Sequence, residues 1–430
     1  MAEHTVRAER TRRDANRAAI ASGIGTAIAG YDFVLYGAAS ALVIGPRFYP
    51  NSDPVAASLF VYSTFATGLL ARPVGSVVLG RLGDRVGRKR TLAISLLAAC
   101  AATGCVGLLP AFETLGVAAP VILVVLRVVQ GLAAGGQWGS AAVLAVEHAG
   151  PRRRGLFGGF TQVGTAVGVL AANNAILLTA ALFPAHVFLS WGWRLPFLVS
   201  FPLAAFALWT RSRVAESPEF REVVERGGPA AAPVVEVVGK YRRRLLLGVL
   251  ASLLGPAVAY AESSFVLSYG TAVLGMDADF LLALALSSAA ATAVSVAASA
   301  ALADRFGPAL LLQVACVATA VLAVPFFLAT GTANPVSTTI AMIAAAMVTG
   351  AVLAPLPAVL ANAFPAAVRC TGVSASFEVG AALAAGLTPV ITTALVGVTR
   401  STLFVALFLA VIALVSAGAV RLLDRAGAGA

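Results

Sequence analysis

The chain has 430 residues, of which 59% are hydrophobic and only 11% are charged, and its mean hydropathy is +0.91. A water-soluble domain of this length needs far more charge to cover its surface. Apolar stretches long enough to cross a bilayer recur along the whole chain. The composition therefore excludes a soluble protein and predicts an all-α polytopic membrane protein.

Hydropathy divides the chain into twelve predicted membrane-spanning segments. They lie near 18–46, 55–79, 91–110, 119–147, 155–182, 190–211, 245–273, 279–303, 308–329, 336–361, 370–396 and 401–423. An even number of crossings places both termini on the same side of the membrane. The first segment is too long for the core of a signal peptide, so we expect no cleaved leader.

The net charge of +11 raises the possibility of a nucleic-acid partner, but the positions of the basic residues exclude it. The tails and loops on the side of the termini carry 25 Lys and Arg residues, whereas the opposite loops carry two, Arg47 and Arg400. The positive-inside rule therefore predicts that both termini are cytoplasmic. Because Arg outnumbers Lys 28 to 2 and alanine is abundant, we expect a GC-rich bacterial source and hence the bacterial plasma (inner) membrane.

A long polar stretch in the middle of the chain separates six predicted segments from the other six. The predicted parts are a cytoplasmic tail (1–17), an N-terminal six-helix half (18–211), a cytoplasmic linker (212–244), a C-terminal six-helix half (245–423) and a short cytoplasmic tail (424–430). A weak repeat supports two related halves, because residues 301–307 echo residues 80–87. Halves related in this way usually rock about a binding site near the bilayer midplane.

The loop 80–90 between the second and third segments contains five basic residues, one acid and three glycines. We interpret it as part of a cytoplasmic gate formed by Gly80, Gly83, Asp84, Arg85, Gly87 and Arg88. The first two glycines would let helices approach, and the aspartate can cap a helix or pair with a basic residue of the other half. We expect the basic residues of the loop, Arg88 among them, to lie at the anionic inner leaflet.

Ionisable side chains inside a membrane usually face a cavity or a partner. Asp32 lies about 21 Å along the first segment at 1.5 Å per residue, near the midplane, and Tyr31 and Tyr36 flank it. In the fourth segment Gln130 and Gln137 share a helical stripe with Arg127. We expect Asp32 and Arg127 to pair and to respond to a proton or an anion.

The second half offers fewer candidates. Glu262 lies in the middle of the seventh segment, with Tyr269 two turns further on, and Glu378 lies inside the eleventh. Each acid can belong to the transport pathway or bond Ser or Tyr across a helix contact, and the sequence leaves both readings open. Arg72 and Arg194 are closer to segment ends, where we expect them to reach the membrane surface.

No pattern of catalytic or metal-binding residues is present. The three histidines lie in tails or at segment ends, and the four cysteines lack metal or disulfide spacing. The absence of a phosphate-cradling loop argues against an ATP-driven pump. We therefore expect no enzymatic activity, no cofactor and no metal, and we predict a secondary transporter.

The chain resembles the metabolite:proton symporter family of the major facilitator superfamily along nearly its whole length. The matching stretches are Tyr31-Asp32-Phe33, residues 64–90 with the pattern G-x-x-x-D-R-x-G-R-K, residues 126–131, 135–139, Trp191-Gly192-Trp193-Arg194-Leu195-Pro196-Phe197, residues 216–220, and Phe364-Pro365 with Arg369. The resemblance implies the major facilitator fold. It also implies uptake of organic acids, shikimate-like compounds or betaines with protons.

The chain departs from this family in its carboxylates. Relatives usually have Glu-Trp where this chain has Ala29 and Gly30, and an acid where it has Gln137 and Asn362. Glu262 and Glu378 are acids that this chain has in addition.

Three hypotheses follow, of which the first is a proton-coupled importer of a small organic acid or zwitterion. In it Arg127 attracts the substrate carboxylate and Asp32 carries or relays the proton. The site is shaped by Tyr31, Tyr36, Gln130 and Gln137, and we expect a monomer whose partners are a small molecule, protons and the bilayer. The second is an exporter of a drug or secondary metabolite coupled through Glu262 and Glu378. It is less favoured because residues 162–168 lack the Gly-Pro pair usual in drug antiporters. The third is a membrane sensor or scaffold that uses the transporter fold. It is the least favoured, because osmosensing relatives carry a long C-terminal coiled coil and we expect none in this sequence.

Overall fold

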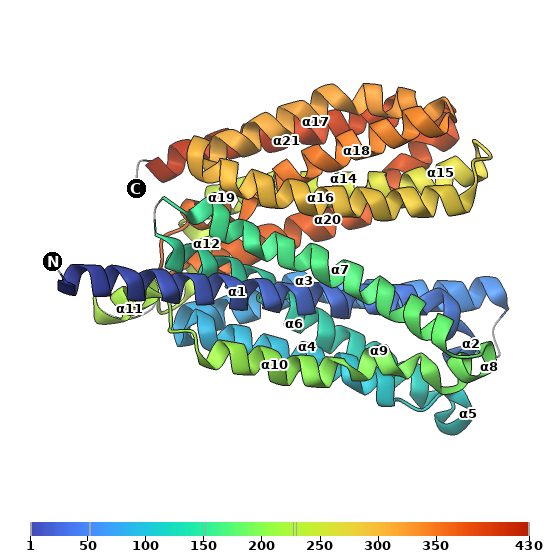
Figure 1. Ribbon diagram of the computed structural model, residues 1–430, viewed down its shortest axis with the longest axis horizontal. Coiled ribbons are helices and arrows are strands. Elements are labelled where there is room, and N and C mark those ends of the chain that lie inside the picture. The colour runs from blue at the N-terminus through green and yellow to red at the C-terminus, as the bar shows by residue number, and fades with distance from the viewer. Residues whose placement is uncertain (1, 51–52, 151, 227, 229, 429–430) are drawn as a thin grey trace. The chain divides into compact units, whose positions relative to one another are not determined.

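The computed structural model describes residues 2–50, 53–150, 152–226, 228 and 230–428, which form helices joined by short turns (Figure 1). Eleven helices in this described part are long and apolar enough to cross a membrane. The second predicted segment, 55–79, is not among these eleven and lies within α3 (Pro54–Val86), a helix of 33 residues. The all-α, polytopic fold predicted from the sequence is confirmed.

The chain forms two compact units, each with its own packed interior. The first contains Met1–His148 and Gly164–Ala231, and the second contains Ala149–Val163 and Ala232–Ala430. Helix α7 (Arg154–Leu182) thus contributes its first turns to the second unit and the rest to the first. The predicted domain limits at residues 211 and 245 stay predictions.

The first unit packs its helices around a cluster of aromatic and aliphatic side chains that includes Leu35, Phe48, Trp193 and Phe197. Its other elements are α1 (Ala2–Ala39), η1 (Ser40–Ile44), α2 (Gly45–Phe48), α4 (Arg88–Leu108), α5 (Phe112–Leu115), α6 (Ala118–Ala149), α8 (Ala185–Val187), η2 (Phe188–Gly192), α9 (Arg194–Leu198), α10 (Ser200–Ser212) and α11 (Pro218–Glu225). Helix α1 begins well before the predicted start at residue 18, although its apolar span is Ala15–Ala39.

The second unit has a separate interior that includes Phe265, Phe326, Phe327 and Met342. Its elements are α12 (Pro233–Gly239), α13 (Arg242–Ala251), α14 (Leu254–Tyr260), η3 (Ala261–Phe265), α15 (Val266–Ala272), α16 (Ala278–Phe306), α17 (Pro308–Gly331), α18 (Pro335–Leu353), α19 (Leu356–Ala363), α20 (Arg369–Thr399) and α21 (Leu403–Ala428). Helices α16, α17, α18 and α21 run side by side (Figure 1).

Prolines explain why three predicted segments are broken rather than continuous. A proline cannot donate to the carbonyl four residues earlier and its ring clashes there. The seventh segment breaks at Ser252 and Leu253, just before Pro256, and the tenth breaks at Ala354 and Pro355. In the sixth segment α9 ends at Leu198, four residues before Pro202. Two of these segments also contain a π-helical turn, η2 and η3, a form frequent at functional sites.

Glycines allow α3 and α6 to pack backbone against backbone. A Cβ atom added at Gly131 would lie 2.0 Å from the carbonyl oxygen of Gly68, and one added at Gly135 would lie 2.1 Å from that of Arg72. Small residues at helix contacts are the usual basis of close packing in membranes. This contact fixes α6, and therefore Arg127, against α3.

We predict opposite effects for the same substitution at two glycines. Gly131→Ala would lower the apparent melting temperature in detergent, because its methyl group meets the α3 backbone. Gly418→Ala in α21 is the matched control, because a Cβ atom added there meets no described atom within 4 Å. Its gain in helix propensity of about 1 kcal/mol is unopposed, so we expect this variant to raise the melting temperature. Fluorescence-detected size-exclusion chromatography after heating measures both, and equal stability of the two variants would contradict the packing argument.

Candidate functional site

Asp32 and Arg127 are both almost fully buried in the first unit, with 2% and 1% of their surfaces exposed. Helix α1 carries Asp32, whose Oδ1 accepts a hydrogen bond from the Ser200 hydroxyl at 2.9 Å. The Cys100 and Thr103 side chains of α4 lie near the same carboxyl. Side chains of α4 and α10 therefore surround the acid that α1 carries.

Gln130 connects the two charged residues. Its amide oxygen accepts a hydrogen bond from Arg127, and its amide nitrogen donates to the main-chain oxygen of Asp32 at 2.9 Å and to Thr103 at 2.8 Å. Among the described side chains no ion pair joins Asp32 directly to Arg127. The expected pairing is thus replaced by a link through the glutamine that follows Arg127 by one helical turn.

Aromatic rings surround the Arg127 guanidinium. Its central carbon lies 4.2 Å from the Tyr36 ring centroid, 5.3 Å from that of Phe65 and 5.8 Å from that of Phe33. Such cation–π contacts stabilise a desolvated cation by up to about 2 kcal/mol each. These contacts do not use its N–H groups, and Nε and Nη2 of Arg127 have no hydrogen-bond partner among the residues that the structure describes.

A cavity of about 10 Å³ lies against these groups, lined by Asp32, Phe33, Arg127, Gln130 and Gln137 among others. This volume corresponds to about one water molecule. Oδ2 of Asp32 and the amide oxygen of Gln137 are also buried, and neither has a hydrogen-bond partner in the described part of the chain. Because unsatisfied buried polar atoms are rare, their concentration here marks a place that binds polar groups.

Arg72, which was expected to reach the membrane surface, lies beside this site, and that expectation stays a prediction. Its guanidinium carbon lies 5.2 Å from the centroid of Phe33, the ring that Arg127 also contacts. The predicted segment ended at residue 79, but α3 continues to Val86, so Arg72 lies well inside the helix. Arg194 instead donates to the carbonyls of Gly107 and Leu109 at the end of α4, a structural role.

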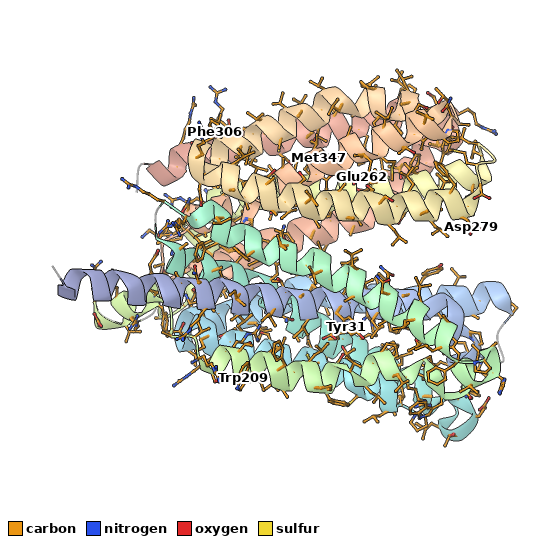
Figure 2. The ribbon with its side chains drawn as sticks, in the orientation of Figure 1. Tyr31, Trp209, Glu262, Asp279, Phe306 and Met347 are labelled. Carbon is orange, nitrogen blue, oxygen red and sulfur yellow. The ribbon has the colours of Figure 1, made fainter. Side chains whose placement is uncertain are left out.

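Two other predicted residues of the first unit differ in their surroundings. Gln137 lines the cavity and donates to the carbonyl of Gly25 at 3.0 Å. The Tyr31 hydroxyl donates to the carbonyl of Pro196 at 2.7 Å, and its ring belongs to the apolar cluster of the first unit (Figure 2). Tyr31 therefore positions α1 against α9, although its neighbour Asp32 faces the cavity.

Arg211 is a buried cation that the sequence analysis did not single out, because it lies where the sixth segment meets the polar linker. It is 2% exposed and donates to the carbonyl of Leu92 at 2.8 Å. Its Nη2 would lie 2.0 Å from a Cβ atom added at Gly25, the residue whose carbonyl Gln137 contacts. A polar track therefore continues from the cavity towards the end of α10.

In the second unit the structure does not gather the predicted residues into one cavity. Glu262 lies in η3 and lines a large cavity, and Thr349 donates to its carboxylate at 2.5 Å. Tyr269 lines a different, small cavity and stacks on Phe265 at 5.5 Å between ring centroids. Glu378 is 1% exposed within α20.

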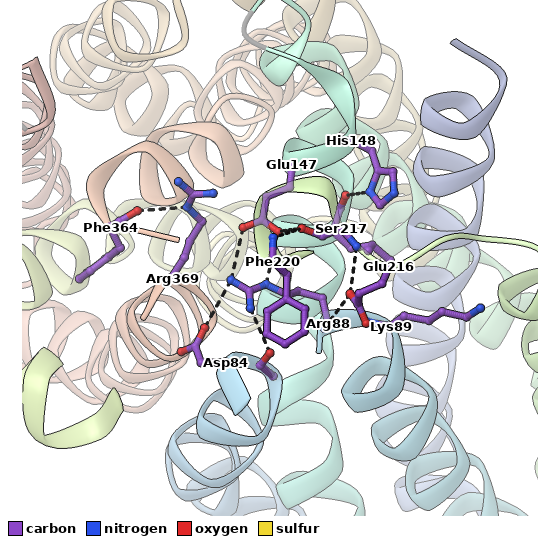
Figure 3. Close-up of polar contacts among 12 residues, drawn as sticks. Asp84, Arg88, Lys89, Glu147, His148, Glu216, Ser217, Phe220, Phe364 and Arg369 are labelled. Atoms are coloured by element: carbon purple, nitrogen blue, oxygen red, sulfur yellow. Dashed lines mark hydrogen bonds and ion pairs between the residues drawn. The ribbon is translucent and has the colours of Figure 1, made fainter. Parts of the chain in front are cut away.

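The loop 80–90 closes around a buried ion-pair network (Figure 3). Gly87, with φ +110°, joins α3 to α4, and Arg88 begins α4 with none of its surface exposed. The Arg88 guanidinium lies 3.6 Å from Asp84 and 3.3 Å from Glu147, and over the ring of Phe220 at 4.7 Å. The expectation that Arg88 faces the lipid leaflet is wrong, because these acids hold it inside.

The polar linker completes this network. Glu216 accepts hydrogen bonds from the main-chain nitrogens of Arg88 and Lys89 at 3.0 and 3.2 Å, so it caps the first turn of α4. Ser217 caps α11 and donates to Glu147. The other predicted residues surround this centre: Gly80 and Gly83 are buried in the last turns of α3, and Arg85 is exposed and donates to the carbonyl of Ala231. The loop and the linker are therefore one folded structure.

A helical bundle with buried charges around a small internal cavity is the architecture of a membrane transporter. Residues 22–377 match the family model described as Major Facilitator Superfamily, and the chain belongs to this superfamily. It is 38% identical over 296 residues to the inner membrane metabolite transport protein YhjE of Escherichia coli (strain K12), covering 68% of this chain and 67% of that protein. It is 37% identical over 318 residues to the shikimate transporter of the same organism, covering 73% and 72%.

Solved structures agree on the fold. The proton:xylose symporter XylE, solved with 6-bromo-6-deoxy-D-glucose, aligns with a TM-score of 0.78 over 95% of each chain at 17% identity. At this identity the similarity concerns the fold alone. The predicted family resemblance is confirmed, and the family and these relatives are transporters rather than enzymes.

We predict that Arg88→Met destabilises the protein strongly. Removing one member of a buried ion-pair network typically costs about 3–5 kcal/mol, because it leaves buried charge uncompensated. Arg90→Met, an exposed arginine in the same loop, is the matched control. Residual monomer after timed heating in mild detergent measures the difference, and equal half-lives would show that the network does not hold the loop.

Proposed function

We propose that this protein is a secondary active transporter that imports a small organic acid or zwitterionic metabolite together with protons by alternating access. The observation that carries the proposal is the state of Arg127. It is a fully buried guanidinium, held by aromatic rings, with two nitrogens free of hydrogen-bond partners beside a polar cavity. Such a group is suited to a carboxylate, which accepts two parallel hydrogen bonds from arginine.

The residues around Arg127 have different roles in the proposed transport. Arg72 adds a second positive charge on the Phe33 ring, which favours an acid over a zwitterion. Gln130 fixes Arg127, and the unpaired oxygen of Gln137 can accept a hydrogen bond from a substrate hydroxyl or ammonium. Asp32, linked to Arg127 through Gln130, carries or relays the proton.

The names of the relatives support this substrate class. A metabolite transporter and a shikimate transporter are similar to this chain over two thirds or more of its length. Shikimate is a hydroxylated carboxylic acid, and one carboxylate with several hydroxyls matches an arginine beside glutamine side chains. We extend to this chain only the class, a small acid with polar substituents.

The remaining features belong to the same proposal. We propose cytoplasmic termini from the distribution of basic residues, and a monomer as the working unit. We propose that the Arg88 network keeps the loop 80–90 and the linker together as a cytoplasmic gate element, because it joins three parts of the first unit through buried charges.

We expect two substitutions to separate binding from coupling. Arg127→Gln would reduce uptake of a transported acid into proteoliposomes by about 100-fold or more, since a buried charged hydrogen-bond partner contributes about 3 kcal/mol. Asp32→Asn would retain binding but lose accumulation driven by an imposed proton gradient. A thermal-shift screen of shikimate, dicarboxylates and betaines identifies the acid to be used.

The control for both is Arg226→Gln, which changes a side chain that is 81% exposed. It should leave uptake and binding unchanged. Gradient-driven accumulation by Asp32→Asn at the level of the unsubstituted protein would refute the proton role of Asp32. Unchanged uptake by Arg127→Gln would refute the binding site itself.

The proposed topology predicts which loops an impermeant reagent reaches. In a background without the four native cysteines, Glu113→Cys would react with a membrane-impermeant maleimide on intact cells. Lys240→Cys in the linker would react only after permeabilisation. Both side chains are exposed, so the side of the membrane on which each lies decides whether the reagent reaches it. The reverse labelling pattern would mean that the termini lie outside.

A further inference from the structure

The second unit contains a cavity of about 330 Å³ that the proposed transport site does not use. It lies among α14, η3, α17, α18 and α21, and its walls are almost entirely aliphatic and aromatic. Small-molecule sites typically measure about 300–1,000 Å³ and place a few polar groups in apolar walls. The cavity therefore has the size and composition of a ligand site.

One edge of the cavity opens between α17 and α18. The lining residues Leu322 and Pro325 of α17, and Ile340 and Ala344 of α18, are exposed on the surface of the chain. All four are apolar, and both helices are long and apolar enough to span a membrane. This opening therefore suits entry from the hydrocarbon region of the bilayer rather than from water.

Glu262 is the ionisable residue among those that line the described cavity (Figure 2). It is 6% exposed, and the π-helical turn η3 carries it. Thr349 donates to one of its carboxylate oxygens. A carboxyl placed in an apolar wall inside a membrane is expensive to keep, so it points to a function.

We propose that this cavity binds a lipophilic amine that enters from the membrane. The ammonium group pairs with the Glu262 carboxylate, and the hydrocarbon body fills the space bordered by α17 and α18. A neutral amphiphile would leave the carboxylate without a counter-charge, and an anionic one would be repelled by it. Thr319, another polar lining residue, provides a hydroxyl oxygen that can accept from the ammonium group.

This site is complementary to the transport site in charge. The cavity beside Arg127 is built for an anion, and the one beside Glu262 for a cation. The two lie in different units, so the amine site does not depend on the proposed transport of an acid.

Three rigid probes of equal shape test the proposal on the purified protein in lipid nanodiscs. They are 1-aminoadamantane, 1-hydroxyadamantane and adamantane-1-carboxylic acid, which differ in one substituent. We expect the amine to bind at least about tenfold more tightly than the alcohol, a difference of about 1.4 kcal/mol, and the acid to bind most weakly. Equilibrium binding and the ligand-induced rise in melting temperature provide independent readouts.

Two variants locate the binding, and two others are controls. Glu262→Gln should reduce the affinity for the amine to that for the alcohol and leave the affinity for the alcohol unchanged. Glu113→Gln, which changes an exposed acid, should alter neither affinity. Ala344→Phe should weaken binding of both probes by filling the exposed mouth, and it provides the test if Glu262→Gln does not fold. Arg127→Gln should not alter amine binding, which separates this proposal from the transport site.

The proposal is overturned if the alcohol binds as tightly as the amine, or if Glu262→Gln retains the preference for the amine. Unchanged binding by Ala344→Phe would also overturn it, because the probes would then occupy another place.

Discussion

Each buried charge in this protein must be balanced by the protein itself, because hydrocarbon supplies neither water nor counter-ions. The first unit meets this requirement in two ways. Arg88 is neutralised by Asp84 and Glu147, which makes it part of a closed structural network. Arg127 is held mainly by aromatic rings and one glutamine, which leaves hydrogen-bond donors available. An arginine thus closes a structural network in one place and, in the proposed function, binds the substrate in the other.

The two glycine-lined contacts of α6 link these places mechanically. Backbone contact between α3 and α6 fixes Arg127 near the rings of Phe33 and Phe65, and Glu147 in the last turn of α6 belongs to the Arg88 network. A shift of α6 would therefore disturb both the recognition site and the loop 80–90. This arrangement is a physical route by which occupancy of the cavity and the state of the loop can influence one another within the first unit.

The positions at which this chain departs from the carboxylates of its family have distinct surroundings. Gln137 keeps its position at the cavity but as a neutral hydrogen-bonding group. Glu262 lines a largely apolar cavity of the second unit, whereas Arg127 lies in the first. Of these acids, Asp32 is the one that Gln130 links to Arg127.

The sequence alone determined the membrane class, the twelve segments, the family and the candidates Asp32, Arg127, Gln130 and Gln137, because hydropathy and rare intramembrane charges are local properties. Only the tertiary structure showed that Gln130 joins Asp32 to Arg127, that Arg72 and Arg127 contact the same Phe33 ring, and that the Tyr31 hydroxyl bonds the Pro196 carbonyl. It also placed Arg88 inside rather than at the lipid surface. These outcomes depend on residues of other helices, distant in sequence, and the burial and partner of a charge follow from which helices pack together.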